Sequence, residues 1–293
     1  MCVERTPTLE EFLAAPVEEV AKVAPATMIY GVGGTRRQAA FNGIEPWSNE
    51  YVRWARTQTM RSAKLIFSQG IRNLLMVALV PGNLQEVDHY RHQLIQRAKW
   101  VIAGDDALAD YKSLGCRARL LGVESESELS ETADYLRQVT SDPERVHTFY
   151  WSIVRDVEDP WRQMFAALQR TQAATQAEAI RALYGEEILP ATLYVAFGKP
   201  TIALEVIPPL LIGKIQCYWT QQPGYTLTET KLRTILYDYA YLRSTWREEK
   251  TERAKEALAH RQAWEEGPIF GLGMRLGPFW YPAPMSSAAW PTV

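Results

Sequence analysis

A continuous apolar run, "IRNLLMVALV" at residues 71–80, constrains the fold of this chain more than any other segment. Gly70 precedes the run, and the turn-forming pair Pro81-Gly82 follows it. A strand in a sheet with helices on both faces has this pattern, because both of its sides contact apolar residues. The run therefore predicts a buried parallel strand in an α/β fold.

Strand patterns and helix patterns then alternate along most of the chain. Further strands are predicted at residues 26–33, 116–123, 147–155, 191–198 and 213–220. Helices are predicted at residues 47–69, 84–103, 127–140, 159–172, 176–185 and 228–266. Such alternation produces βαβ units, in which the strands run parallel and the helices cover the faces of the sheet. We therefore expect an α/β fold with a mostly parallel central sheet flanked by helices.

Several helix boundaries are marked by capping residues. Thr8 and Glu11 have the spacing of a capping box, and Gly185 has the position of a C-terminal cap. Asp159 is predicted as an N-cap, with Pro160 in the first helical position. These residues support the helix predictions independently of the apolar pattern.

The domain organisation is expected to be simple. No linker rich in Pro, Gly or Ser divides the chain into two halves. We therefore expect residues 1–293 to form a single domain. Its last part, residues 267–293, is a Gly-, Pro- and Trp-rich tail that we expect to cover the surface or an oligomer interface, or to be partly disordered.

Composition places the chain among ordinary globular proteins. Hydrophobic residues make up 47% and charged residues 23%, and the formal net charge is -2. Both signs of charge are spread along the chain, so no basic face for nucleic acid is expected. The three scattered cysteines, an N-terminus without an apolar leader and the lack of a long apolar run favour a cytoplasmic protein without a membrane span.

The segment "MIYGVGGTRRQ", Met28 to Gln38, carries the main candidate binding site. Ligands of parallel sheets bind beyond the carboxyl ends of the strands, which is where this glycine turn is predicted. Its backbone N–H groups could cradle phosphate oxygens, and Arg36 and Arg37 could supply bidentate donors. The spacing fits neither a dinucleotide-binding motif nor a Walker A loop. These residues alone support an anion site and a plain turn with surface arginines equally.

Three polar segments are weighed as metal sites. "DDALAD" at residues 105–110 has one residue too many for the D-D-x-x-D motif of terpene cyclases. "DVED" at residues 156–159 is better explained as a helix N-terminus, where carboxylates complement the helix dipole. His89 and His92 lack a third ligand at a suitable spacing, so a solvated helix face is favoured. No metal ligand is assigned from these segments.

Aromatic residues gather at the start of the helix that follows the glycine turn. Trp47, Tyr51 and Trp54 all lie there. Core packing is the simpler explanation for each of them. The functional alternative is that their faces line an apolar pocket and stabilise a cation through the ring quadrupoles.

The order of these motifs resembles that of a known family. The chain is similar to the cis-prenyltransferase (undecaprenyl diphosphate synthase-like) fold in its "GGTRR", its helical tyrosine, its "SQGIRNLLMVALVPGN" and its strand ending at Gly122. It resembles more specifically the bacterial diterpene synthases of that fold, of the tuberculosinol and kolavelool type. This resemblance rests on "LYGE" at residues 183–186, "FGK" at residues 197–199 and "YTLTETKLRTILYDYAYLR" at residues 225–243.

The resemblance implies a reaction and its partners. A bicyclic diterpenyl diphosphate, made by a separate class II cyclase, loses its diphosphate. Water then captures the allylic cation and gives a diterpene alcohol such as kolavelool. The family also implies Mg²⁺ as the cofactor and a homodimer formed through the late helices.

The resemblance further assigns roles to individual residues. Tyr51 aligns with a tyrosine of the family's site and would stabilise the cation or orient the water or base. Trp47 and Trp54 would join it in the hydrophobic pocket. The remaining residues belong to the diphosphate motif, and they are Gly33, Gly34, Thr35, Arg36, Arg37 and Lys199.

Gly33 departs from the family pattern. The family has an aspartate here, which in chain-elongating relatives holds the Mg²⁺ that bridges the diphosphate. Three explanations stay open: other acids bind the metal, diphosphate and water alone hold it, or the chain is an inactive variant. The alternatives to a diterpene synthase are a chain-elongating cis-prenyltransferase and a non-catalytic subunit of that fold. Lys199 stands in place of the paired arginines and serine of elongating relatives, which argues against elongation.

Overall fold

The computed structural model describes residues 5–46, 48–84, 88–123, 127–203, 207–242, 257–267 and 269–283. In this part of the chain, the strands form a six-stranded sheet and a two-stranded hairpin. The strands of the large sheet are β1 (Thr27–Gly31), β2 (Asn73–Leu79), β3 (Cys116–Leu121), β4 (His147–Ile153), β5 (Ala191–Phe197) and β6 (Ile212–Thr220). The hairpin pairs β7 (Gly273–Leu276) with β8 (Phe279–Pro282) in antiparallel register.

The large sheet is parallel throughout. Its strand order is β3-β4-β2-β1-β5-β6, and every neighbouring pair runs in the same direction. The long apolar run forms β2, which pairs with β1 on one side and with β4 on the other. The buried parallel strand predicted at residues 71–80 is therefore confirmed.

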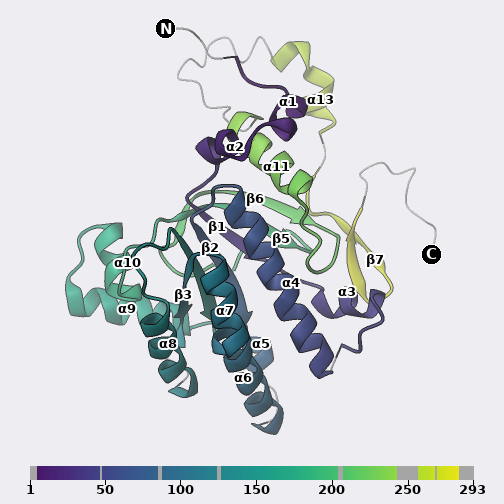
Figure 1. The fold of residues 1–293 in the computed structure, drawn as a ribbon. Coiled ribbons are helices and arrows are strands. Elements are labelled where there is room, and N and C mark those ends of the chain that lie inside the picture. Colours follow the sequence, from purple (N-terminus) through teal and green to yellow (C-terminus); the bar gives the residue numbers. More distant parts are fainter. Residues whose placement is uncertain are drawn as a thin grey trace.

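Helices connect the strands and cover the sheet (Figure 1). Before β3 these are α1 (Leu9–Ala14), α2 (Val17–Val23), α3 (Thr35–Phe41), α4 (Asn49–Ser68), α5 (Pro81–Leu84), α6 (Asp88–Ala103) and α7 (Asp105–Ser113). After β3 they are α8 (Ser127–Val139), α9 (Asp159–Thr171), α10 (Gln176–Tyr184), α11 (Glu229–Tyr237) and α13 (Arg261–Glu265). None of the helices in the described ranges combines the length and apolar character that crossing a membrane requires.

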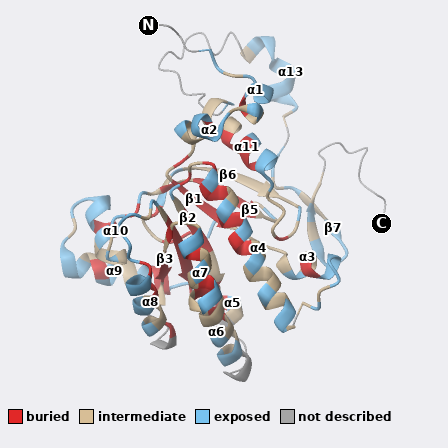
Figure 2. Cartoon of the chain, in the orientation of Figure 1, coloured by how far each residue is buried: buried red, intermediate tan, exposed pale blue. Residues whose placement is uncertain are grey.

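The hydrophobic core lies on both faces of the sheet, because successive strand residues point to opposite sides. Met28 and Tyr30 of β1 belong to the larger cluster, which residues of α1, α2, α4, α6, α7, α8 and α11 complete. Ile29, between them, belongs to a smaller cluster on the other face, together with Ile180 of α10 and Ile207. Figure 2 shows that the buried residues are concentrated in the central strands.

The order in which the chain adds strands to the sheet changes direction at the sheet's centre, between β1 and β5. β1 and β5 are neighbours, yet the chain passes from β1 through α3 and α4 to β2 on one side and from β5 to β6 on the other. A crevice forms where the connections diverge in this way, and open α/β sheets bind their ligands there. The glycine turn after β1 and Phe197, the last residue of β5, meet at this place.

The helix boundaries agree with the sequence predictions in most places. The capping box at the start of α1 is present, and Gly185 ends α10 in the left-handed conformation. The prediction of Asp159 as an N-cap is wrong, since Glu158 holds that position and Asp159 is the first residue of α9. Asp159 forms an ion pair with Arg162 one turn later instead, as residues three apart on a helix can.

The C-terminal part of the chain is described only in pieces. The helix predicted at residues 228–266 begins at its expected cap, Thr228, and α11 passes into a π-helical turn at Asp238–Leu242. Residues 243–256 lie outside the described part of the chain. In the predicted tail, β7 and β8 form the hairpin, which lies beside α3 in Figure 1.

Candidate active site

The glycine turn after β1 is held in place by a distant loop. Gly34, the N-cap of α3, has a left-handed backbone with φ of 68°, which glycine adopts without strain. The Gly33 carbonyl accepts a hydrogen bond of 2.7 Å from the Gly224 N–H. The Gln38 side chain accepts another, also of 2.7 Å, from the Tyr225 N–H. The turn is therefore fixed to the loop that follows β6.

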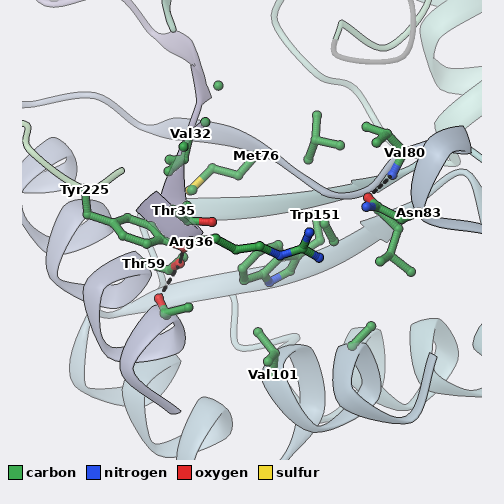
Figure 3. A pocket seen from close by; sticks show the side chains of 18 of the residues that line it. Val32, Thr35, Arg36, Thr59, Met76, Val80, Asn83, Val101, Trp151 and Tyr225 are labelled. Carbon is green, nitrogen blue, oxygen red and sulfur yellow. Dashed lines mark hydrogen bonds between the residues drawn. The ribbon is translucent and has the colours of Figure 1, made fainter. Parts of the chain in front are cut away.

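A cavity of about 650 Å³ opens beside this turn, and its volume is typical of small-molecule sites. Its walls come from the carboxyl ends of β1, β2, β4 and β5 and from α3, α4 and α6 (Figure 3). Much of the lining is apolar or aromatic, and includes Met76, Leu79, Val101, Trp151 and Phe197. The cavity thus combines an apolar wall with the polar end formed by the glycine turn.

Arg36 and Arg37 leave α3 on different sides. Arg36 lines the cavity, and its side chain extends into it in Figure 3. Arg37 is absent from the described lining, and its guanidinium lies 3.9 Å from the centroid of the Phe279 ring and 5.4 Å from that of Phe197. One helical turn holds 3.6 residues, so adjacent side chains point roughly 100° apart. The turn therefore presents one arginine to the cavity and the other to aromatic rings.

Tyr51 connects the cavity wall to the glycine turn. Its hydroxyl oxygen lies 2.6 Å from the Oγ1 atom of Thr35, the first residue of α3. Ser48 caps α4 by accepting a hydrogen bond from the Tyr51 N–H, which fixes the backbone there. Tyr51 and Thr35 both line the cavity. They place two hydroxyl groups beside the turn that carries Arg36.

Trp54 lies behind the cavity wall. Its ring is 6.2 Å from the ring of Tyr51 and meets the ring of Tyr225 edge-on at 5.8 Å. Both tyrosines line the cavity, whereas Trp54 is absent from the described lining. Trp54 therefore supports two lining residues. Trp47, the third predicted aromatic residue, lies outside the described residues.

Tyr225 is a lining residue that the sequence patterns did not single out. Its hydroxyl lies 3.0 Å from Oγ1 of Thr59 in α4. Burial raises the pKa of Tyr225, and it raises the pKa of Tyr194, another lining residue, to about 12. Both phenols are therefore protonated at neutral pH and can act as neutral donors. The position of Tyr225 soon after the last predicted strand could have revealed it, because the carboxyl ends of parallel strands meet at one edge.

Among the described lining residues, three arginines from three helices reach the cavity: Arg36 from α3, Arg56 from α4 and Arg97 from α6. Arg56 forms ion pairs with two acids of α7, Asp110 and, at 3.6 Å, Asp106. The acids of the "DDALAD" segment thus balance the charge of an arginine in the cavity wall. This contact gives that segment a structural role.

The described lining does not suit a protein-bound Mg²⁺. Proteins hold Mg²⁺ through carboxylate oxygens, and no Asp or Glu occurs among the described residues that line the cavity. Throughout the described ranges, no three His, Cys, Asp or Glu side chains converge as a metal site would require; the side chain of His89 lies outside them. At Gly33, a Cβ atom would lie only 2.7 Å from the Phe197 ring. A side chain at position 33 would therefore meet this ring.

Two cavity residues, in the loop after β5 and just beyond β2, are not among the site residues predicted from the sequence. Lys199, a predicted diphosphate ligand, is exposed and absent from the described lining, whereas Thr201 of the same loop lines the cavity. Asn83, which the sequence patterns did not single out, lines it just beyond β2 and accepts a hydrogen bond of 3.1 Å from the Val80 N–H.

Known proteins resemble the chain over nearly its full length. No protein-family profile matches it. It is 48% identical to (+)-kolavelool synthase of Herpetosiphon aurantiacus, over 94% of this chain and 96% of that protein. It is 26% identical to tuberculosinyl adenosine transferase of Mycobacterium tuberculosis, over 93% of this chain and 97% of that protein.

Solved structures share the fold at low sequence identity. Lavandulyl diphosphate synthase from Lavandula x intermedia, solved with dimethylallyl diphosphate, has a TM-score of 0.57 and 16% identity, covering 75% of this chain and 97% of that one. A probable undecaprenyl diphosphate synthase from Campylobacter jejuni has a TM-score of 0.53 and 14% identity, covering 77% and 98%. The expected cis-prenyltransferase fold is confirmed. With the identity to (+)-kolavelool synthase, these likenesses establish that the chain belongs to the diterpene synthases built on the cis-prenyltransferase fold.

Proposed function

We propose that this protein ionises a bicyclic diterpenyl diphosphate of the kolavenyl or tuberculosinyl type and quenches the allylic cation with water. The products are inorganic diphosphate and a diterpene alcohol such as kolavelool. The observation that carries the proposal is the 48% identity with (+)-kolavelool synthase over almost the whole of both chains. The cavity beside the glycine turn is the place we assign to this reaction.

The polar end of the cavity suits the departing diphosphate. When the allylic C–O bond breaks heterolytically, both electrons stay on the diphosphate oxygen and its negative charge grows. Arg36 lines the cavity next to the backbone of Gly34 and Thr35. Donors that are already in place stabilise the growing charge more than the bound substrate, and this difference lowers the barrier.

The apolar end suits the carbocation that is left behind. Trp151, Phe197 and Tyr225 line the cavity with aromatic rings, and the faces of such rings attract a cation. The Tyr51 and Thr35 hydroxyls lie where the two ends meet and could position one water molecule. The water oxygen gives an electron pair to the allylic carbon, and its proton passes to a base. The released diphosphate is a candidate for that base.

The competing functions have less support. A chain-elongating enzyme needs a second diphosphate site, and Lys199, which stands in place of that motif, is exposed and absent from the described lining. A non-catalytic subunit would not need a cavity of about 650 Å³ with arginines at its wall. The open cavity and the sequence identity together favour an enzyme.

One assay separates these functions. The purified protein is incubated with kolavenyl, tuberculosinyl, geranylgeranyl and farnesyl diphosphates, with and without isopentenyl diphosphate, adenosine and Mg²⁺. We expect a C20 alcohol from a bicyclic substrate and no longer chains. Elongated products would support the cis-prenyltransferase alternative, an adenosine adduct would make the acceptor adenosine, and no turnover would support the non-catalytic subunit.

We also propose that residues 1–293 act as one domain and assemble as a homodimer, with the substrate supplied by a separate class II cyclase. The two hydrophobic clusters pack on opposite faces of one sheet, which favours a single domain. Light scattering should give the mass of two chains. A monomer would contradict the expectation that the late helices form an interface.

A further inference from the structure

The contact between Gly33 and Phe197 explains why position 33 carries no acid. A Cβ atom on Gly33 would lie 2.7 Å from Cδ1 and 3.3 Å from Cβ of Phe197. The first distance is far below a normal contact between carbon atoms. Cβ of Phe197 is attached to its backbone, so only a rotation of the whole ring, which moves Cδ1, could relieve the closer contact. Space, and not backbone conformation, therefore requires glycine at this position.

The Phe197 ring also has contacts beyond the glycine turn. Phe197 is the last residue of β5 and pairs with Thr220 of β6, which fixes its backbone. The Arg37 guanidinium lies 5.4 Å from the Phe197 ring and 3.9 Å from the Phe279 ring of the C-terminal hairpin. Displacing Phe197 would disturb this group of contacts. The ring is thus a fixed part of the site, and an aspartate at position 33 does not fit beside it.

The charges of the cavity point the same way. Arg36 and Arg97 line it, as does Arg56 with its charge balanced by acids of α7, and the described lining contains no carboxylate. A guanidinium group binds phosphate oxygens directly, often through two parallel N–H···O hydrogen bonds. A protein-held Mg²⁺ instead needs acidic ligands. The cavity is therefore equipped to bind an anion with its own side chains.

We propose that this protein binds the diphosphate group directly through the cavity arginines, and that the Gly33–Phe197 contact has taken the place of a protein-held divalent cation. The inference rests on the proposed function in one respect, namely that the ligand carries a diphosphate. Arg37 then acts indirectly, as a positioning residue that holds Phe197 against the turn.

Two binding measurements on the full chain test this proposal. Calorimetry with inorganic diphosphate in EDTA should show binding, and Arg36→Ala should weaken it at least about 10-fold, since one charge-assisted contact is lost. Electron paramagnetic resonance with Mn²⁺ alone should show no bound ion. Stoichiometric Mn²⁺ binding without diphosphate, or diphosphate binding that requires Mg²⁺, would overturn it.

Substitutions at the contact give a second test. Gly33→Ala and Gly33→Asp should each lower the melting temperature by about 3 to 8 °C, because the added atoms overpack a filled site. Gly82→Ala is the matched control, since a Cβ there meets nothing within 4 Å. The double variant Gly33→Asp with Phe197→Ala should recover stability and bind Mn²⁺ at least about 10-fold more tightly than the parent. A Gly33→Asp protein of unchanged stability would contradict the inference.

The two proposals can fail separately. If the protein binds diphosphate in EDTA but converts none of the diterpenyl diphosphates, the proposed function fails and the inference stands. If it produces the C20 alcohol but binds Mn²⁺ without diphosphate, the inference fails and the proposed function stands.

Discussion

The two ends of the parallel sheet use arginine in opposite ways. At the carboxyl ends of the strands, Arg36 extends into a cavity. Near the amino end of β2, Arg233 of α11 is buried, and its guanidinium donates to the Gln69 side chain and to the carbonyls of Leu13 and Ala15. An arginine buried among backbone carbonyls stabilises the fold, whereas one that extends into a cavity can bind a ligand. The comparison predicts that stability and activity depend on different ends of the sheet.

Removing the arginine at the amino end should have the largest effect. We expect Arg233→Ala to lower the free energy of unfolding by about 3 kcal/mol, because it leaves buried carbonyls without donors. Urea denaturation measures the loss, and kcat/KM of the remaining folded protein should stay within about 2-fold of the parent. The Arg233→Lys protein, which keeps the charge and one donor group, should have a free energy of unfolding between those of the parent and Arg233→Ala. An Arg233→Ala protein of full stability would break the comparison.

Removing the arginine at the carboxyl end should reduce activity instead. We expect Arg36→Ala to lower kcat/KM at least about 100-fold, the scale for losing one donor to a developing charge. The free energy of unfolding should change by less than about 0.5 kcal/mol. Steady-state kinetics with the best diterpenyl diphosphate measures the first quantity and urea denaturation the second. Unchanged kinetics would mean that the diphosphate lies elsewhere.

The Tyr51 hydroxyl should have a smaller effect at the same end. We expect Tyr51→Phe to lower kcat about 10-fold, because it removes one hydrogen bond to Thr35 and with it the positioning of the water. Tyr225→Phe is the control, since the Tyr225 hydroxyl contacts Thr59 and not the turn. A greater loss for Tyr225→Phe would shift the assigned water position toward α4.

Arg37 should have the smallest effect. A double-mutant cycle of Arg37→Ala and Phe279→Ala should give a coupling of about 0.5 to 1 kcal/mol in unfolding free energy, which is the usual strength of a cation–π pair. The loss in kcat/KM for Arg37→Ala should stay well below that for Arg36→Ala. Equal losses would show that Arg37 binds the diphosphate during the reaction.

Patterns within single elements explain what the sequence predicted well. The apolar run at residues 71–80 predicts β2 because a strand in a covered sheet has no solvent-facing side. Gly185 predicts the end of α10 because helices often end at a residue with left-handed backbone, a conformation that glycine adopts without strain. The place of the candidate site follows in the same way, since a parallel sheet collects its loops at one edge.

Contacts between distant elements explain what the sequence did not predict. The Gly33–Phe197 contact depends on β1 and β5 being neighbours. The spacing of apolar residues within a single strand or helix does not show which strands pair. The sequence could in principle have predicted that Arg36 and Arg37 point in different directions. Both lie in one helical segment of "GGTRR", and one turn holds 3.6 residues. Without the helix start at Thr35, however, the sequence does not say which of the two faces the ligand.

The hydrogen bonds that hold the glycine turn also determine when the site is completed during synthesis. Gln38 and Tyr225, which form one of them, are 187 residues apart in the chain. Contacts across such a separation form late, because closing a long loop costs entropy before any contact repays it. A nascent chain therefore has β1 and β2 long before the glycine turn can be fixed, and the ligand can assist only the last stage of folding.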